Sequence, residues 1–450
     1  MLVIVSDLHL GDGTTAASIQ HSAFEVFARR LNETAYFASW RKDGSYRPIE
    51  TLDVILMGDI LDPLHSTRWL DSRDLRPWSD PYSPEYSSKL LEITRAILDE
   101  NKESLAVLRR CASGKIVKLP PATRGKKPDF KTGEQILLKV RFHYMVGNHD
   151  WYYHLRGPAF DQIRAEVVKK MGLCNPVSPF PYEADESQLL KELFARYKVL
   201  GRHGDCFDKF NYDSEKGRDH SAIGDAFTMN VCNRFPVEVQ KRYGNELPEG
   251  IIDSLRRITN IRPALAAPLW ISGQIKAYAG GPALENELKE VWDRIAEEFL
   301  QLDFIRQMDK AFEFDIVDAM ELFVKISRHA SFSTINDAVV WMREKMWGGE
   351  QSFLSHALRE PAFLNDSVRY VAYGHTHHYE VIPLDAHGGA PYAESQVYFN
   401  SGTWHSYYDL AMKNPREQKF VPYQALAYLT FYTDGEYQGR LFDTWSGMYE

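Results

Sequence analysis

The sequence has few cysteines, and no two of them form a CxxC motif. A chain of 450 residues contains only Cys111, Cys174, Cys206 and Cys232. This scarcity argues against a disulfide-stapled domain and against a zinc site built from paired thiolates. It fits the reducing environment of the cytoplasm, where we expect the protein to be.

Long apolar runs and an excess of basic residues are also missing. No run approaches a membrane span of about 18 apolar residues, so we expect no membrane span. The N-terminal "MLVIV" is short and follows no charged region, which argues against a signal peptide. The net charge of −9 disfavours a dedicated nucleic-acid-binding protein, although it does not exclude a local basic groove.

The chain does contain a series of short apolar runs, rich in β-branched residues, that end in polar side chains. These runs occupy residues 2–7, 52–59, 141–148, 197–205 and 368–375. Runs of this length bounded by glycine are typical of buried strands. Because a helical pattern at 15–40 separates the first two runs, we predict an α/β fold with helices on both faces of a sheet. Three later runs, at 396–404, 425–433 and 439–445, are predicted to close a second sheet.

Two long stretches of sequence separate predicted strands from one another. Residues 63–140 include a helix expected at about 86–112. Residues 206–366 show helical spacing at 282–305 and 331–348, so we expect a mostly helical insertion there.

This pattern divides the chain into two units. Residues 1–205 and 367–450 would form a catalytic core, with 63–140 inserted into it. Residues 206–366 would form a cap or substrate lid, and they also offer a surface for a homodimer.

Metal-ligand side chains follow each of the five apolar runs. The motifs are "DLH" (Asp7, His9), "GDILD" (Asp59, Asp62), "GNHD" (Asn148, His149), "RHGD" (His203) and "GHTH" (His375, His377). Ligands gather beyond the carboxyl ends of the strands in an open α/β sheet, so we expect these side chains to converge. Residues i and i+2 of an extended chain share a side, so each histidine of "GHTH" can point into one pocket.

The kind and number of these donors indicate the metal. Carboxylate, amide and imidazole groups without thiolate favour Mn²⁺, Fe²⁺ or Zn²⁺. A mononuclear catalytic zinc needs about three protein ligands. This set has about twice that number, so the sequence favours two ions.

The five motifs in this order resemble those of the calcineurin-like metallophosphoesterase superfamily. The resemblance covers about 1–62, 141–205 and 367–410. It implies a two-sheet α/β/β/α sandwich and hydrolysis of a phosphoester by a metal-bridging hydroxide. The expected cofactors are two divalent ions, with Mn²⁺ favoured over Fe²⁺ or Zn²⁺.

The same resemblance implies a role for each motif residue. One ion would be bound by Asp7, His9 and His377, the other by Asn148, His203 and His375, and both by Asp59. His149 would lie beside the substrate, oriented by Asp62. Asp150 and Asp205 would be supporting groups.

Two differences from the superfamily's motifs indicate which branches of the superfamily the chain resembles least. Pro63 stands where the protein Ser/Thr phosphatases have arginine, which disfavours that role. His149 stands where the diacylglucosamine pyrophosphate hydrolases usually have arginine. We therefore expect a small phosphodiester or phosphomonoester substrate, such as a nucleotide. The alternatives are a nuclease, a pyrophosphate hydrolase or a non-catalytic binding module on the same core.

Several of these residues also have a structural interpretation that requires no metal or substrate. Taken alone, Asn148 could be a turn residue and His377 a core histidine. Arg68, Arg73 and Arg76 could reach a phosphate, although solvated positions are the commoner outcome for such arginines. His65 has an ordinary interpretation as a core or surface histidine. His378 follows the ligand pair and would face the other way in an extended chain, so it is a candidate substrate contact only.

Overall fold

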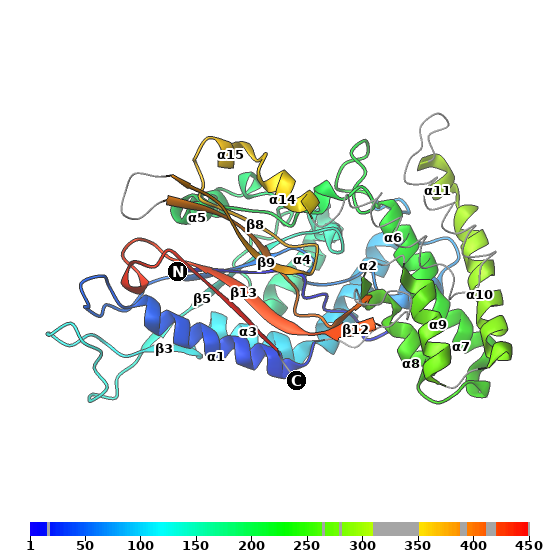
Figure 1. The fold of residues 1–450 in the computed structure, drawn as a ribbon, viewed down its shortest axis with the longest axis horizontal. Helices are drawn as coiled ribbons and strands as arrows, with labels where there is room; N and C mark the ends of the chain where they lie inside the picture. The colour runs from blue at the N-terminus through cyan, green and yellow to red at the C-terminus, as the bar shows by residue number, and fades with distance from the viewer. Residues whose placement is uncertain are drawn as a thin grey trace.

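The computed structural model describes residues 1–15, 19–262, 266–278, 281–308, 351–387, 394–410 and 420–448. These residues form a mixed α/β structure with two main sheets, helices on the outer faces of the sheets and further helices gathered at one end (Figure 1). The predicted α/β class is therefore confirmed.

The first sheet carries three of the five motifs. Its strands, in spatial order, are β14 (Phe442–Met448), β13 (Ala425–Phe431), β1 (Leu2–Val5), β2 (Leu52–Met57) and β5 (Val140–Met145). Because β1, β2 and β5 run parallel, their motifs emerge at the same edge of the sheet. Side chains alternate along β1, so that Val3 packs with the helices and Ile4 packs with the second sheet.

The positions of β13 and β14 correct one prediction. Both were expected in the second sheet, but β13 pairs antiparallel with β1, and β14 pairs with β13. The pairing gives the buried β1 a hydrogen-bonded neighbour on each side, and its backbone groups need such partners away from water. An apolar run predicts a strand, but it does not tell which sheet the strand joins.

The second sheet carries the other two motifs. Its strands, in spatial order, are β6 (Val199–Gly201), β8 (Tyr370–Tyr373), β10 (Glu394–Ser401) and β9 (Tyr379–His387). The sequence did not predict β9, whose central proline and charged residues weaken the strand pattern. The rings of Tyr370 and Phe399 lie 5.2 and 5.5 Å from the ring of Phe431 in the first sheet. The two sheets therefore pack face to face.

Helices cover the outer face of each sheet. The first sheet is covered by α1 (His21–Ala38), α2 (Pro84–Glu100), α3 (Lys102–Ala112) and α4 (Pro158–Met171). The second is covered by α14 (Gln351–Ala357) and α15 (Pro361–Leu364), while α5 (Gln188–Tyr197) packs beside β6.

The single helix expected at about 86–112 is instead two helices, α2 and α3. They meet at Asn101, whose Nδ2 donates to the carbonyl oxygens of Ile97 and Gly11, each at 2.8 Å. Gly11 follows the first motif, so this break in the helix ties both helices to the motif loop. A short hairpin, β3 (Val117–Leu119) and β4 (Ile136–Leu138), completes the stretch.

Up to residue 308, the described part of 206–366 is mostly helical and has its own hydrophobic cluster, whereas α14 and α15 at its end pack on the second sheet. Its main helices are α6 (Ile223–Phe227), α7 (Arg234–Tyr243), α8 (Ile251–Arg256), α9 (Ala267–Ala277), α10 (Pro282–Leu300) and α11 (Asp303–Met308). Phe227, Trp292 and Phe299 are among the residues buried within this cluster, away from the core of the first sheet. The helix predicted at 331–348 lies outside the described residues.

A small sheet attaches these helices to the chain after β10. It contains β12 (Phe420–Tyr423), β11 (Tyr407–Leu410) and β7 (Ile261–Arg262). Ile261 pairs with Tyr408, so the helical segment is held against the edge where the motifs emerge.

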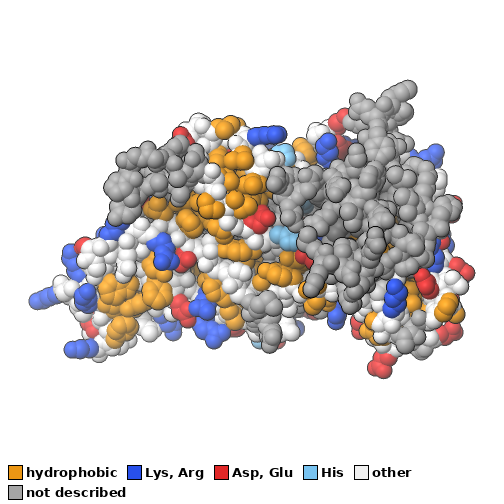
Figure 2. All heavy atoms as spheres, in the orientation of Figure 1, with side chains coloured by type: hydrophobic (Ala, Val, Ile, Leu, Met, Phe, Trp, Pro, Cys, Tyr) orange, Lys and Arg blue, Asp and Glu red, His pale blue; other side chains and the backbone are white. Residues whose placement is uncertain are grey.

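Within the described residues, no helix combines the length and the apolar character that crossing a bilayer requires. On the face drawn in Figure 2, the described Lys and Arg side chains are scattered among acidic and apolar ones.

Candidate metal centre

The predicted ligands begin where the strands end, and most of them have an unusual backbone. The angle φ is positive at Asp7 (54°), His9 (44°), Asp59 (55°), His375 (67°) and His377 (65°). A left-handed conformation costs a residue other than glycine about 1–3 kcal/mol, and such strain clusters at functional sites. The chain is not extended at these positions, so the side chains converge through sharp turns rather than through strand alternation.

The first group of ligand atoms comes from Asp7, His9 and His377. His9 Nε2 lies 3.0 Å from His377 Nε2 and 3.8 Å from Asp7 Oδ1. His377 Nε2 lies 3.4 Å from the same carboxylate oxygen. All three side chains are buried. The structure therefore brings together the three residues predicted to bind one ion.

The second group comes from Asn148, His203 and His375, with Asp59. Asn148 Oδ1 lies 3.2 Å from His203 Nε2 and 3.0 Å from His375 Nδ1. His203 Nε2 is also 3.1 Å from Asp59 Oδ2. Asn148 Nδ2 is buried and has no hydrogen-bond partner among the described residues, so within them the amide is held by its oxygen alone.

Asp59 lies between the two groups. Its Oδ2 is 3.8 Å from His9 Nε2 and 3.1 Å from His203 Nε2, so one oxygen faces both groups. Its Oδ1 accepts the backbone N–H of His149 at 2.8 Å. Burial opposes ionisation, but the imidazoles of His203 and His149 outweigh it and hold the pKa of Asp59 far below its usual value. This ionised carboxylate therefore lies between the two groups.

The charges of the two groups fit cations. Burial alone would lower the pKa of His9, but the carboxylates of Asp62 and Asp7 raise it to about 10. The carboxylates of Asp59 and Asp7 likewise outweigh burial and raise the pKa of His203 to about 10. Protons thus supply the positive charge that these carboxylates demand, and metal ions can replace those protons.

The spacing of the ligand atoms also fits metal ions. Ligand atoms about 2.1 Å from a shared ion lie roughly 3.0–3.4 Å from one another, close to the separations in both groups. The glycines leave the room that these contacts need. A Cβ added at Gly374 would lie 2.6 Å from Asp7 Oδ2, and one at Gly147 would collide with Asp59 and His203.

Asp62 lies beside the first group and contacts three imidazoles. Its Oδ2 is 2.8 Å from His9 Nδ1, 3.2 Å from His149 Nδ1 and 2.6 Å from His65 Nδ1. His149 is half-buried, and its predicted place beside a substrate stays a prediction. The sequence did not single out His65; its position three residues after Asp62 in the same loop was the available signal.

Two further contacts come from the 206–366 segment and were not predicted. Asp208 Oδ2 lies 3.0 Å from His375 Nε2, the ring nitrogen that faces away from Asn148. Arg262 NH2 lies 3.0 Å from His377 Nδ1. Asp208 follows the "RHGD" motif closely, whereas no sequence pattern marks Arg262. The helical segment thus contacts both histidines of "GHTH".

The supporting and alternative residues occupy more ordinary positions. Asp150 accepts the backbone N–H groups of Gly147 and Ile60 and thereby fixes the loop that carries Asn148. Asp205 pairs with Arg218 at 2.5 Å. Arg68 pairs with Asp12, while Arg76 donates to backbone carbonyl oxygens; the exposed Arg73 has no ion pair among the described residues.

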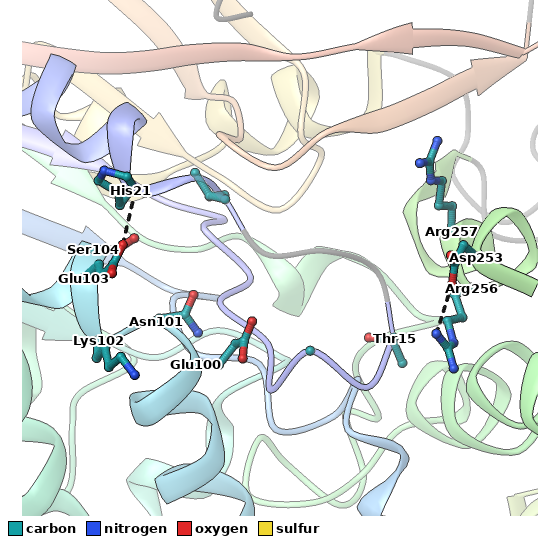
Figure 3. A pocket seen from close by; sticks show the side chains of 12 residues that line it. Thr15, His21, Glu100, Asn101, Lys102, Glu103, Ser104, Asp253, Arg256 and Arg257 are labelled. Atoms are coloured by element: carbon teal, nitrogen blue, oxygen red, sulfur yellow. Dashed lines mark hydrogen bonds and ion pairs between the residues drawn. The ribbon is translucent and has the colours of Figure 1, made fainter. Parts of the chain in front are cut away.

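A hollow of about 580 Å³ lies apart from both groups, between the start of α1, the α2–α3 junction and α8 (Figure 3). Charged side chains of both signs line it; Glu103 lies 3.5 Å from His21, and Asp253 pairs with Arg256 at 3.0 Å. None of the predicted site residues is among the described residues that line it. The metal-ligand groups therefore remain the candidate site.

The structure is a mixed α/β protein in which buried His and Asp side chains gather at the strand ends in groups that could hold a metal ion, with Asp59 between His9 and His203. The chain matches no protein-family model, and comparison with curated protein sequences finds no match.

Proposed function

We propose that the protein is a metal-dependent phosphoric ester hydrolase of the calcineurin-like metallophosphoesterase superfamily. The observation that carries the proposal is the position of Asp59 Oδ2 between His9 and His203, which suits a ligand shared by two ions. Asp7, His9 and His377 would hold one ion, and Asn148, His203 and His375 the other. The face-to-face sheets with outer helices support the two-sheet sandwich of that superfamily.

We favour Mn²⁺ as the resident metal, since nitrogen and oxygen donors surround both positions and no thiolate does so in the described residues. When bound, the two cations would acidify a water molecule and draw charge from the phosphoryl oxygens.

His149 is the residue best placed to protonate the leaving oxygen. Its Nδ1 faces Asp62 at 3.2 Å, which leaves Nε2 for the substrate. Burial opposes protonation, but the carboxylates of Asp62 and Asp59 raise the pKa of His149 above its usual value. This effect favours the protonated imidazole, which is the form that can transfer a proton as the ester bond breaks.

The helical segment restricts the substrate. Asp208 and Arg262 reach the site from this segment, which supports a lid role for 206–366. A small phosphodiester or phosphomonoester, such as a nucleotide, fits such a site better than a nucleic-acid duplex. The scattered basic side chains in Figure 2 offer no track for a phosphate backbone on the described part of that face.

Hydrolysis assays on the manganese-loaded protein test the proposal. We expect turnover of bis(p-nitrophenyl) phosphate or p-nitrophenyl phosphate, with two manganese ions per chain by elemental analysis. Asp59→Asn should lose manganese and activity together, while Asp43→Asn, at an exposed position, should lose neither. Absence of turnover on both esters, with manganese bound, would contradict the proposal.

A further inference from the structure

Arg262 is a cation that the helical segment places against the metal-ligand groups. It lies on β7, paired with Asp409 of β11, and its side chain is half-buried. NH1 donates to the carbonyl oxygens of Thr259 and Ile261 at 3.1 and 3.0 Å. These two bonds orient the guanidinium so that NH2 faces His377.

The guanidinium has no carboxylate partner in the described residues. No acidic oxygen among them lies within 4.0 Å of its nitrogens, although Asp409 and Asp7 are near enough to influence it. Its acceptor at NH2 is the ring of His377, at 3.0 Å from Nδ1 and 3.3 Å from Nε2.

Metal binding removes this acceptor. His377 Nε2 faces His9 Nε2 and Asp7 Oδ1, so Nε2 is the atom that would bind an ion. A neutral imidazole has one lone pair and one N–H, so the proton then lies on Nδ1. Nδ1–H and the NH2 group of Arg262 would be two donors facing each other. The guanidinium must therefore find an anionic oxygen elsewhere in the site.

Resting on the hydrolase function above, we propose that Arg262 binds a non-bridging oxygen of the substrate phosphate. The helical segment then supplies part of the active site as well as its cover. Since NH1 is held by the backbone, one nitrogen remains for the phosphate. Arg262 thus requires one anionic oxygen, which phosphomonoesters and phosphodiesters both provide.

Phosphate affinity of the metal-loaded protein tests this role. We would measure the dissociation constant of inorganic phosphate by titration calorimetry, and manganese content by elemental analysis. Arg262→Ala should weaken phosphate binding at least about tenfold with manganese content unchanged, and Arg262→Lys should weaken it less. The matched control is Arg257→Ala, which removes an arginine of the same segment that hydrogen-bonds Tyr408 and is not among the predicted site residues.

Two results overturn the inference. One is unchanged phosphate affinity in Arg262→Ala with both manganese ions retained. The other is loss of manganese along with phosphate, which would assign Arg262 to the metal centre. If the wild-type protein still hydrolyses the nitrophenyl esters in either case, only this inference is lost. A wild-type protein that binds no manganese would remove the proposed hydrolase function and this inference together.

Discussion

His9 Nε2 lies 3.0 Å from His377 Nε2, although 368 positions separate the two residues in the sequence. The other ring nitrogen of His9 contacts Asp62, and that of His377 contacts Arg262. Burial and the guanidinium hold the pKa of His377 well below its usual value, which keeps this ring neutral. Two imidazoles from opposite ends of the chain therefore face one small volume, and a neutral ring is the form that binds a metal ion.

Replacing His149 separates proton transfer from metal binding. We expect His149→Ala to lower kcat by about 10²–10⁴-fold, because the leaving oxygen loses its proton donor. Manganese content should stay at the wild-type value. His65→Ala is the matched comparison, since His65 contacts the same carboxylate, and it should lower kcat far less. Equal losses in the two variants would remove His149 from its assigned role.

Asp208 should strengthen the second metal position. Its carboxylate accepts from His375 Nε2 at 3.0 Å, which fixes the ring and makes Nδ1 a better ligand. We expect Asp208→Asn to weaken manganese binding at one of the two sites by about 10–100-fold in a calorimetric titration. Asp213→Asn is the control, because Asp213 contacts only Lys216 and nearby backbone groups among the described residues. Unchanged affinity in Asp208→Asn would contradict this role.

Gly374 is required by the close approach of Asp7. An added Cβ would lie 2.6 Å from Asp7 Oδ2 and 2.5 Å from Ser6 Oγ. Gly374→Ala should therefore displace Asp7, reduce manganese content and destabilise the protein by about 1–3 kcal/mol in urea unfolding. Gly435→Ala, where an added Cβ meets nothing within 4 Å, should leave manganese binding intact.

The pH dependence of stability should include a contribution from His154. Burial opposes protonation, but Asp219 and Glu186 raise the pKa of His154 to about 9. The pKa is higher in the folded state, so the stabilisation is complete below about pH 6.5 and is lost as the pH rises through about 9. Compared with His154→Gln, the wild type should lose about 1–2 kcal/mol of unfolding free energy over that range, since solvent screens these partly exposed partners. Parallel urea unfolding curves at several pH values measure the difference.

The sequence predicted the strands and the converging ligands because both depend on short, local patterns. Apolar runs that end in Asp, Asn or His marked β1, β2, β5, β6 and β8, and the structure brings their terminal side chains together. The sheet to which β13 and β14 belong could not be predicted, since strand pairing depends on contacts across more than 400 residues.

Arg262 and Asp208 were out of reach for a related reason. Each contacts a histidine more than 100 positions away. Asp208 closely follows the "RHGD" motif, but the sequence does not tell which histidine it contacts, and no pattern marks Arg262. His65 was accessible in principle, because it shares a loop with Asp62. Its contact, however, depends on the turn that follows Pro63, which local propensity alone does not specify.

The left-handed backbone at Asp7, His9, Asp59, His375 and His377 also bears on how the protein would respond to laboratory evolution. Glycine or asparagine relaxes such positions, so selection for heat resistance alone would favour those replacements. The selected protein would be more stable but would lack these metal-ligand side chains. The same selection run in excess manganese should preserve them, because the energy of binding offsets the strain.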